Sequence, residues 1–191
     1  MLDVRVFHKT SEDSLPSILS EGLRYGEEGS NSQDDRVRAA NEFLNGACPN
    51  ELKGEGVDRR ACIYCYLGVG DDLIFDVESG RVLEQQRWDV GVGNAKLRLR
   101  VEPETAFVSD LDAFDALLHR MEARAGEDEL ATLAAEYWQR LVRLDDVRAH
   151  YRLEDEALVA AGTAPTGLPR RLERVEALVT VHVAKSRIQQ L

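Results

Sequence analysis

The chain has 191 residues, of which 43% are hydrophobic, and this length and composition fit one globular domain. Its 35 acidic and 24 basic residues give a net charge of −11, which argues against broad binding to nucleic-acid phosphates while leaving room for a local basic patch. No apolar run approaches the roughly 20 residues of a membrane span or resembles a secretory signal. We therefore expect a soluble, cytoplasmic domain of bacterial type without membrane contacts.

Hydrophobic periodicity, together with the positions of glycine and proline, predicts a mixture of strands and helices. The predicted strands are 3–8, 61–69, 73–77, 96–101, 105–108 and 174–183, and the predicted helices are 14–23, 35–45 and several within 110–151. Strands occur throughout the sequence and helices fall in uneven groups, which is typical of the α+β class. We expect a single α+β domain over 1–191 with a helical segment at about 110–160. Its first and last strands could be neighbours.

Three cysteines, Cys48, Cys62 and Cys65, are too few to form a disulfide framework. The single pair Cys62-x-x-Cys65 is a weak zinc signal, because structural zinc sites usually have four ligands. Strand periodicity places these two thiols on opposite faces, so we expect no metal site. The sequence also lacks the P-loop, dinucleotide-binding, serine-hydrolase and HExxH motifs, which leaves those enzyme classes unsupported.

Two motifs near the start of the sequence stand in a defined order. His8-Lys9-Thr10 closes the first predicted strand, and ILSEGL at 18–23 lies on the helix that follows, with Gly22 suited to its end. This pair resembles the ADP-ribosyltransferase superfamily, where a strand ending in His-x-Thr or His-x-Ser precedes a helix of the form ILxxGL. The family commonly has glycine where this chain has Lys9. A strand histidine alone is more often a core residue, but the coupled helix favours the functional interpretation.

Two later segments resemble the histidine–tyrosine–glutamate branch of that superfamily. Tyr64 in CIYCYL matches its strand tyrosine, and Tyr66 on the same face is the alternative. Both could equally be ordinary strand aromatics, which β-propensity favours. RVEALV at 174–179 resembles the late strand that carries the family's glutamate, here Glu176, although a solvent-facing structural carboxylate is the simpler interpretation. Arg174 replaces the Glu or Gln of the arginine-modifying toxins, which weakens any expectation of protein-arginine specificity.

The resemblance implies split antiparallel β-sheets around an NAD cleft with a helical insertion. It also implies an NAD-dependent mono-ADP-ribosyltransferase, by analogy a toxin or defence effector, with NAD as co-substrate. His8 and Thr10 would bind NAD, Tyr64 or Tyr66 would stack on nicotinamide, and Glu176 would stabilise the positive charge that develops on the ribose.

The acceptor stays open among protein, nucleic acid and small molecule, and an antitoxin protein is a candidate partner. The polar loop at 25–35 would act as a lid, and the loop at 161–171, with Arg170 and Arg171, would help to choose the substrate. Two alternatives remain: an RNA 2′-phosphotransferase-like enzyme and a non-catalytic nucleotide-binding module of the same fold.

Overall fold

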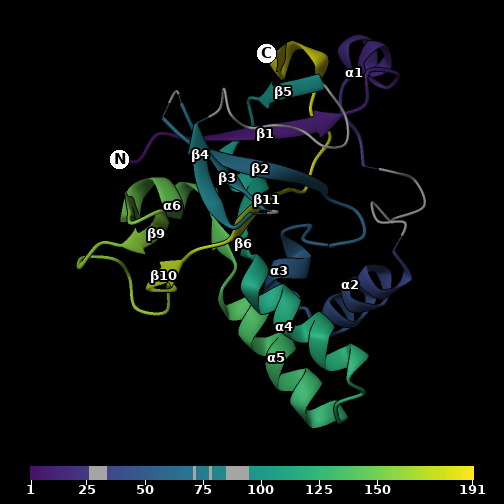
Figure 1. Ribbon diagram of the computed structural model, residues 1–191, viewed down its shortest axis with the longest axis vertical. Helices are drawn as coiled ribbons and strands as arrows, with labels where there is room; N and C mark the ends of the chain where they lie inside the picture. The colour runs from purple at the N-terminus through teal and green to yellow at the C-terminus, as the bar shows by residue number, and fades with distance from the viewer. Residues whose placement is uncertain (26–33, 71, 78, 85–94) are drawn as a thin grey trace.

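The computed structural model describes residues 1–25, 34–70, 72–77, 79–84 and 95–191 and confirms an α+β protein with antiparallel sheets (Figure 1). The central sheet runs in the order β12-β5-β1-β2-β11-β6-β7, and β3 and β4 extend it from β2. Its strands are β1 (Val4–Thr10), β2 (Ile63–Val69), β3 (Leu73–Asp76), β4 (Arg81–Glu84), β5 (Ala95–Leu99), β6 (Ala106–Asp110), β7 (Val142–Arg143), β11 (Val175–Val179) and β12 (Ile188–Gln190). A separate small sheet contains β8 (Tyr151–Glu154), β9 (Ala157–Ala160) and β10 (Arg171–Leu172).

The strands that pair with β2 differ between its beginning and its end. The end of β2 from Tyr66 to Val69 pairs with β1, and its beginning from Ile63 to Cys65 pairs with β11. From His8 onward β1 continues along β5 instead. The expectation that the first and last long strands are neighbours is therefore wrong, because β2 lies between β1 and β11.

The sheet is buried on both faces in its β2–β11–β6 part. Alternation sends Cys65 and Ala177 into one hydrophobic core, and it sends Leu178 with Cys62, which precedes β2, into a second core under the helices. All five residues of β11 are consequently buried. The two cysteines of the CxxC pair lie in different cores, as strand periodicity predicts.

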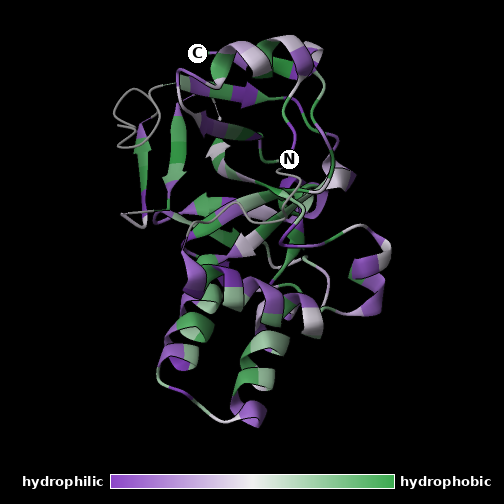
Figure 2. Cartoon of the chain, turned by 90° about the vertical axis from the view of Figure 1, so that its right-hand side faces the viewer, coloured by the Kyte–Doolittle hydropathy of each residue, from purple (hydrophilic) through white to green (hydrophobic). Residues whose placement is uncertain are grey.

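The helices are α1 (Leu15–Glu21), α2 (Asp35–Ala47), α3 (Asn50–Gly54), α4 (Leu111–Glu122), α5 (Glu127–Gln139) and α6 (Leu144–His150). Helices α2, α3, α4 and α5 lie at one end of the molecule, whereas α1 lies at the opposite end near the C-terminus and α6 lies beside the small sheet (Figure 1). The hairpin of α4 and α5 extends away from the sheet, with α2 beside it (Figure 1). Figure 2 shows that these helices carry both hydrophobic and hydrophilic faces. Trp138 of α5 is buried in the core that lies under these helices.

Helix α1 is tied to the segment that follows β11. Leu23 and Val183 exchange two backbone hydrogen bonds of 2.8 and 2.9 Å immediately after the helix ends. Gly22 makes this approach with φ of 99°, and a Cβ there would lie 2.6 Å from the carbonyl oxygen of Val183. The ILSEGL motif therefore requires glycine because another backbone occupies the space of a side chain.

The helical segment expected at about 110–160 is shorter than predicted. Its last helix, α6, ends at His150, and residues 151–160 form the hairpin of β8 and β9. The turn residues Asp155 and Glu156 adopt positive φ values of 49° and 59°, as two-residue hairpin turns require. No helix within the described ranges is both long and apolar enough to cross a membrane. Most of the predicted lid loop at 25–35 lies outside the described residues.

Candidate functional site

Residues predicted from distant parts of the sequence line one cavity. It has a volume of about 240 Å³, and its lining comprises His8, Lys9, Tyr64, Cys65, Tyr66, Val77 and Glu176. We call it the His8 cavity. It forms where β1 and β2 cease to pair, which exposes side chains from both strands to a shared space. His8, Tyr64, Tyr66 and Glu176 thus come together although β2 separates the strands of His8 and Glu176.

Tyr64 lies at the junction of three cavities. Besides the His8 cavity, it lines a cavity of about 290 Å³ with His8, Leu23, Arg24, Tyr25 and Ile63. It also lines a cavity of about 250 Å³ on the helical side of Glu176. His8 joins the first two cavities and Glu176 joins the first and third, so the three spaces adjoin one another around a single tyrosine.

His8 is oriented by one contact with the backbone. Its Nδ1 lies 3.1 Å from the carbonyl oxygen of Tyr64, which can only accept, so Nδ1 carries the proton and Nε2 is left as an acceptor. Burial lowers the pKa of His8 below its ordinary 6.5, and the bond to the Tyr64 carbonyl opposes this shift. The ring is therefore neutral at pH 7 and can receive a hydroxyl group.

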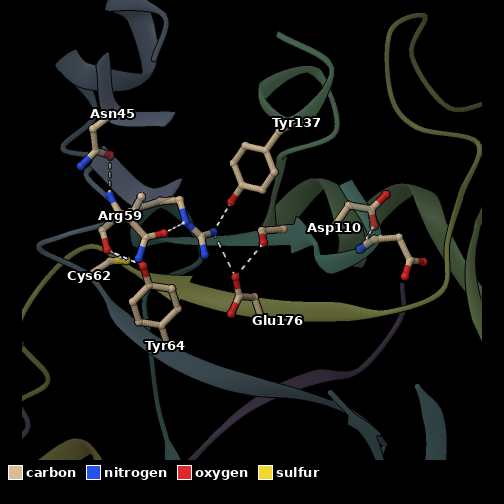
Figure 3. A network of polar contacts seen from close by, with 10 residues as sticks. Asn45, Arg59, Cys62, Tyr64, Asp110, Tyr137 and Glu176 are labelled. Atoms are coloured by element: carbon tan, nitrogen blue, oxygen red, sulfur yellow. Dashed lines mark hydrogen bonds and ion pairs between the residues drawn. The ribbon is translucent and has the colours of Figure 1, made fainter. Parts of the chain in front are cut away.

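Glu176 occupies a position that the solvent-facing interpretation does not explain. It is 9% exposed, on a strand between β2 and β6. Its Oε1 accepts from Arg59 Nη1 and from Ser109 Oγ, each at 3.0 Å (Figure 3). No hydrogen bond to a described residue involves Oε2. The carboxylate is thus fixed by one oxygen, and the other is available to a ligand.

Arg59 is a site residue that the sequence did not reveal. It is 2% exposed, in the turn before β2, and its side chain forms an ion pair with Glu176. Its Nη1 also donates to the hydroxyl of Tyr137, and its Nε donates to Asn41 Oδ1 at 2.8 Å. The only sequence signal is its position before a strand that carries a candidate tyrosine, which any surface arginine could share.

The surroundings of Arg59 link the site to the helices. Its guanidinium carbon lies 4.5 Å from the ring centroid of Phe114 and 5.1 Å from that of Tyr64, within the range of cation–π attraction. Tyr64 donates its hydroxyl to the carbonyl oxygen of Arg59. Burial raises the pKa of Tyr137 to about 12, against the opposing effect of Arg59, so its hydroxyl is neutral at pH 7.

The two candidate tyrosines differ in their surroundings. Tyr66 lies beside the small apolar cluster of Phe7 and Ile74, and Lys9 Nζ lies 4.6 Å from its ring centroid. Tyr64 lines all three cavities, whereas Tyr66 belongs to the described lining of the His8 cavity alone. Lys9 therefore covers Tyr66 rather than Tyr64.

Other predicted residues lie outside the His8 cavity. Thr10 lies opposite Ala95 at the end of β1 and does not belong to the described lining. Arg174 instead bonds to Asp112 and Asp115 of α4. Arg170 and Arg171 of the predicted specificity loop line a separate surface cavity with Asp112, Arg140 and Glu173, where acidic groups offset their charge.

Comparisons with protein-family models, curated proteins and solved structures give no match for this chain. The site must therefore be interpreted from its chemistry. In the described part of the chain, no cluster of three or more His, Cys, Asp or Glu residues could hold a metal ion. The site combines a half-engaged carboxylate, a neutral imidazole and an aromatic ring at a junction of cavities. Such a set can bind a polar ligand with a ring and stabilise positive charge beside Glu176.

Proposed function

We propose that this protein is an NAD-dependent mono-ADP-ribosyltransferase with Glu176 as its catalytic carboxylate. The observation that carries the proposal is the His8 cavity, where His8, Tyr64 and Glu176 lie together despite their separation in the sequence. Their arrangement fits the order of motifs that resembles the histidine–tyrosine–glutamate branch. The split of pairing along β2 supports an ADP-ribosyltransferase-like fold in the same way, since it creates the cleft between two parts of the sheet.

Each step of the proposed chemistry has a suitable group. Cleavage of the bond between nicotinamide and the ribose anomeric carbon develops positive charge on the sugar, which the Glu176 carboxylate would stabilise. Arg59 and Ser109 hold Oε1, so Oε2 can remain directed at the ribose without reorientation. A carboxylate fixed in advance costs little reorganisation when the charge appears.

The ligand would be held by the remaining cavity residues. Nε2 of the neutral His8 would accept a hydrogen bond from a ribose hydroxyl. Tyr64, held by its bond to the Arg59 carbonyl, would offer a fixed ring for stacking on nicotinamide. The cavity that Tyr64 shares with Arg24 and Tyr25 gives the rest of the dinucleotide a cationic side chain and an aromatic ring.

The ion pair of Glu176 with Arg59 favours one second candidate, a non-catalytic nucleotide-binding module. An arginine that neutralises the carboxylate weakens its attraction for a cationic transition state. Lys9 in the cavity lining adds positive charge near the same place. In this case the His8 cavity would bind a nucleotide without cleaving it.

Nicotinamide release from NAD by the intact protein distinguishes the two functions. We expect turnover in the wild type and a loss of about 100-fold to 1000-fold in Glu176→Gln, which keeps the shape of the side chain and removes its charge. Glu173→Gln is the matched control, because Glu173 lies three residues before Glu176, is exposed and pairs with Arg171. NAD binding by calorimetry without turnover would establish the binding module, and turnover that survives Glu176→Gln would refute the catalytic assignment.

A further inference from the structure

A second cavity of about 250 Å³ lies on the helical side of Glu176. Its lining comprises Val37 and Asn41 of α2, Leu111 and Phe114 of α4, and Arg59, Tyr64 and Glu176. We call it the α2–α4 cavity. It shares Tyr64 and Glu176 with the His8 cavity, so these two side chains form the boundary between the two spaces.

Asn41, a polar residue in the lining of this cavity, is only partly engaged by described residues. Asn41 is 6% exposed, and its Oδ1 accepts from Arg59 Nε at 2.8 Å. No hydrogen bond to a described residue involves its Nδ2, although Asn41 belongs to the cavity lining. This Nδ2 is not one of the buried polar atoms that lack a partner in the described residues, so water reaches it and a ligand acceptor can take the place of that water. The Nδ2 group therefore offers a hydrogen bond to a ligand.

The walls of the cavity define what that ligand can be. Val37, Leu111 and Phe114 are apolar, and the opposite charges of Arg59 and Glu176 form a pair. Because Arg59 and Glu176 neutralise one another, their pair offers little net attraction to a cationic or an anionic group. The volume is below the range of about 300–1,000 Å³ for drug-sized ligands, so one small ring system fits. An uncharged planar ring with a hydrogen-bond acceptor on its edge meets all of these conditions.

The two cavities have the geometry that group transfer needs. A leaving group departs from one side of the reacting carbon while the acceptor attacks from the other, and a carboxylate between them serves both. We propose that the α2–α4 cavity is the acceptor subsite and takes a free, uncharged heteroaromatic small molecule, with Asn41 as its specificity-determining residue. This inference rests on the proposed function. The net charge of −11 favours a free molecule over a polyanion.

The proposed transfer balances in atoms and electrons. The bond between the ribose anomeric carbon and the nicotinamide ring nitrogen breaks, and the electron pair leaves with neutral nicotinamide. A nitrogen or oxygen of the acceptor ring forms the new bond to the anomeric carbon. The proton that this atom loses passes to Oε2 of Glu176 and then to water, which restores the carboxylate.

The test measures nicotinamide release and ADP-ribosylated product in the same reactions. The probes are thymidine and guanosine as neutral rings, agmatine as a cationic acceptor, and a single-stranded DNA oligonucleotide. We expect a product with a free nucleoside and none with agmatine. In Val37→Phe, whose added ring would fill the cavity, the ratio of transfer to NAD hydrolysis should fall by about tenfold or more.

Asn41→Asp keeps an oxygen for Arg59 Nε and replaces the free donor with an acceptor. We expect the KM for the nucleoside to rise by about tenfold or more relative to the KM for NAD. Asn50→Asp, the same change at an exposed position, is the matched control. Three outcomes would each overturn the inference. The first is nicotinamide release without any nucleoside product, and the second is modification of the oligonucleotide or of agmatine alone. The third is an unchanged ratio of transfer to NAD hydrolysis in Val37→Phe. Absence of nicotinamide release in every reaction would instead refute the proposed function.

Discussion

The two sides of the His8 cavity are held in different ways. On one side, side chains from β6 and from the turn before β2 fix Glu176, and α2 and α5 hold Arg59 in turn. On the other side, the one hydrogen bond that the His8 side chain makes to a described residue goes to a backbone carbonyl. The Glu176 side is therefore a buried, cooperative network, in which each substitution acts through several residues. The His8 side depends mainly on the path of the backbone.

Among the substitutions that compare the two sides, removal of Arg59 should cause the largest loss of stability. Arg59→Met leaves the Glu176 carboxylate buried and unpaired, which should lower the free energy of unfolding by about 3–5 kcal/mol. Urea denaturation measures the change. Arg60→Met is the control, because Arg60 is half-exposed and should change stability by about 0.5 kcal/mol or less. The double variant Arg59→Met/Glu176→Gln should recover part of the loss, and no recovery would show that Arg59 acts independently of Glu176.

On the His8 side, the most sensitive position is a backbone contact. In Gly22→Ala the new Cβ would collide with the Val183 carbonyl at a positive φ, which should cost about 1–3 kcal/mol. Gly46→Ala is the matched control, since Gly46 lies in α2 with no atom within 4 Å of a Cβ there, and it should gain about 0.5–1 kcal/mol. Thermal unfolding of both variants measures the difference. If the two variants changed the melting temperature by the same amount, the close approach between α1 and Val183 would be refuted.

Loss of one hydroxyl tests whether the network positions the carboxylate. Tyr137→Phe removes the acceptor of Arg59 Nη1 and should cost about 1–2 kcal/mol. If the proposed activity is present, its kcat should fall more than its KM changes, because Arg59 holds Glu176. Tyr151→Phe also loses a buried hydroxyl bond, to the Pro169 carbonyl at 2.7 Å, but lies outside the described site. It should lose stability alone, so equal losses of kcat in both variants would argue against positioning.

The smallest expected effect is the pH dependence that His8 contributes. Its pKa in the folded protein is below the ordinary 6.5, so the unfolded chain takes up a proton first as the pH falls below 6.5. Stability should therefore decrease in that range by at most about 1.4 kcal/mol per pH unit. His8→Asn should lack this component in denaturation curves between pH 7 and pH 5. The same slope in both proteins would show that His8 is not held neutral by burial.

Sequence patterns predict the local elements of this fold well and their partners poorly. The alternation at 61–69 and 174–183 predicts strands where β2 and β11 lie, although β11 ends at Val179, four residues earlier than expected, and ILSEGL gives the correct helix end. The insertion of β2 between β1 and β11 carries no local signal, since either order buries the same apolar faces. The hairpin at 151–160 also carries little local signal. Its turn residues, Asp155 and Glu156, adopt positive φ without the glycine that usually marks a two-residue hairpin turn.

The residues of the candidate site likewise fall into those that sequence motifs identify and those that only the tertiary structure reveals. His8, Tyr64 and Glu176 could be singled out because they lie in short motifs of defined order. Arg59 could not, because its burial depends on Asn41 and Tyr137 from two helices distant in sequence. Periodicity identifies a residue's face on its own element, but it does not identify which charged side chain from elsewhere will occupy the space above that face.

The place of β11 between β2 and β6 also determines the order in which the site can assemble. Both neighbours precede it in the chain by many residues, so the centre of the sheet stays open during synthesis until residue 179 has been made. Pairings of such long sequence separation form slowly, since loop closure must precede the contacts that reward it. Until then Arg59 lacks the carboxylate that neutralises it, and the two cores lack the strand that both of them enclose. A nascent chain that stops before β11 would thus contain the imidazole and the tyrosines but no complete site.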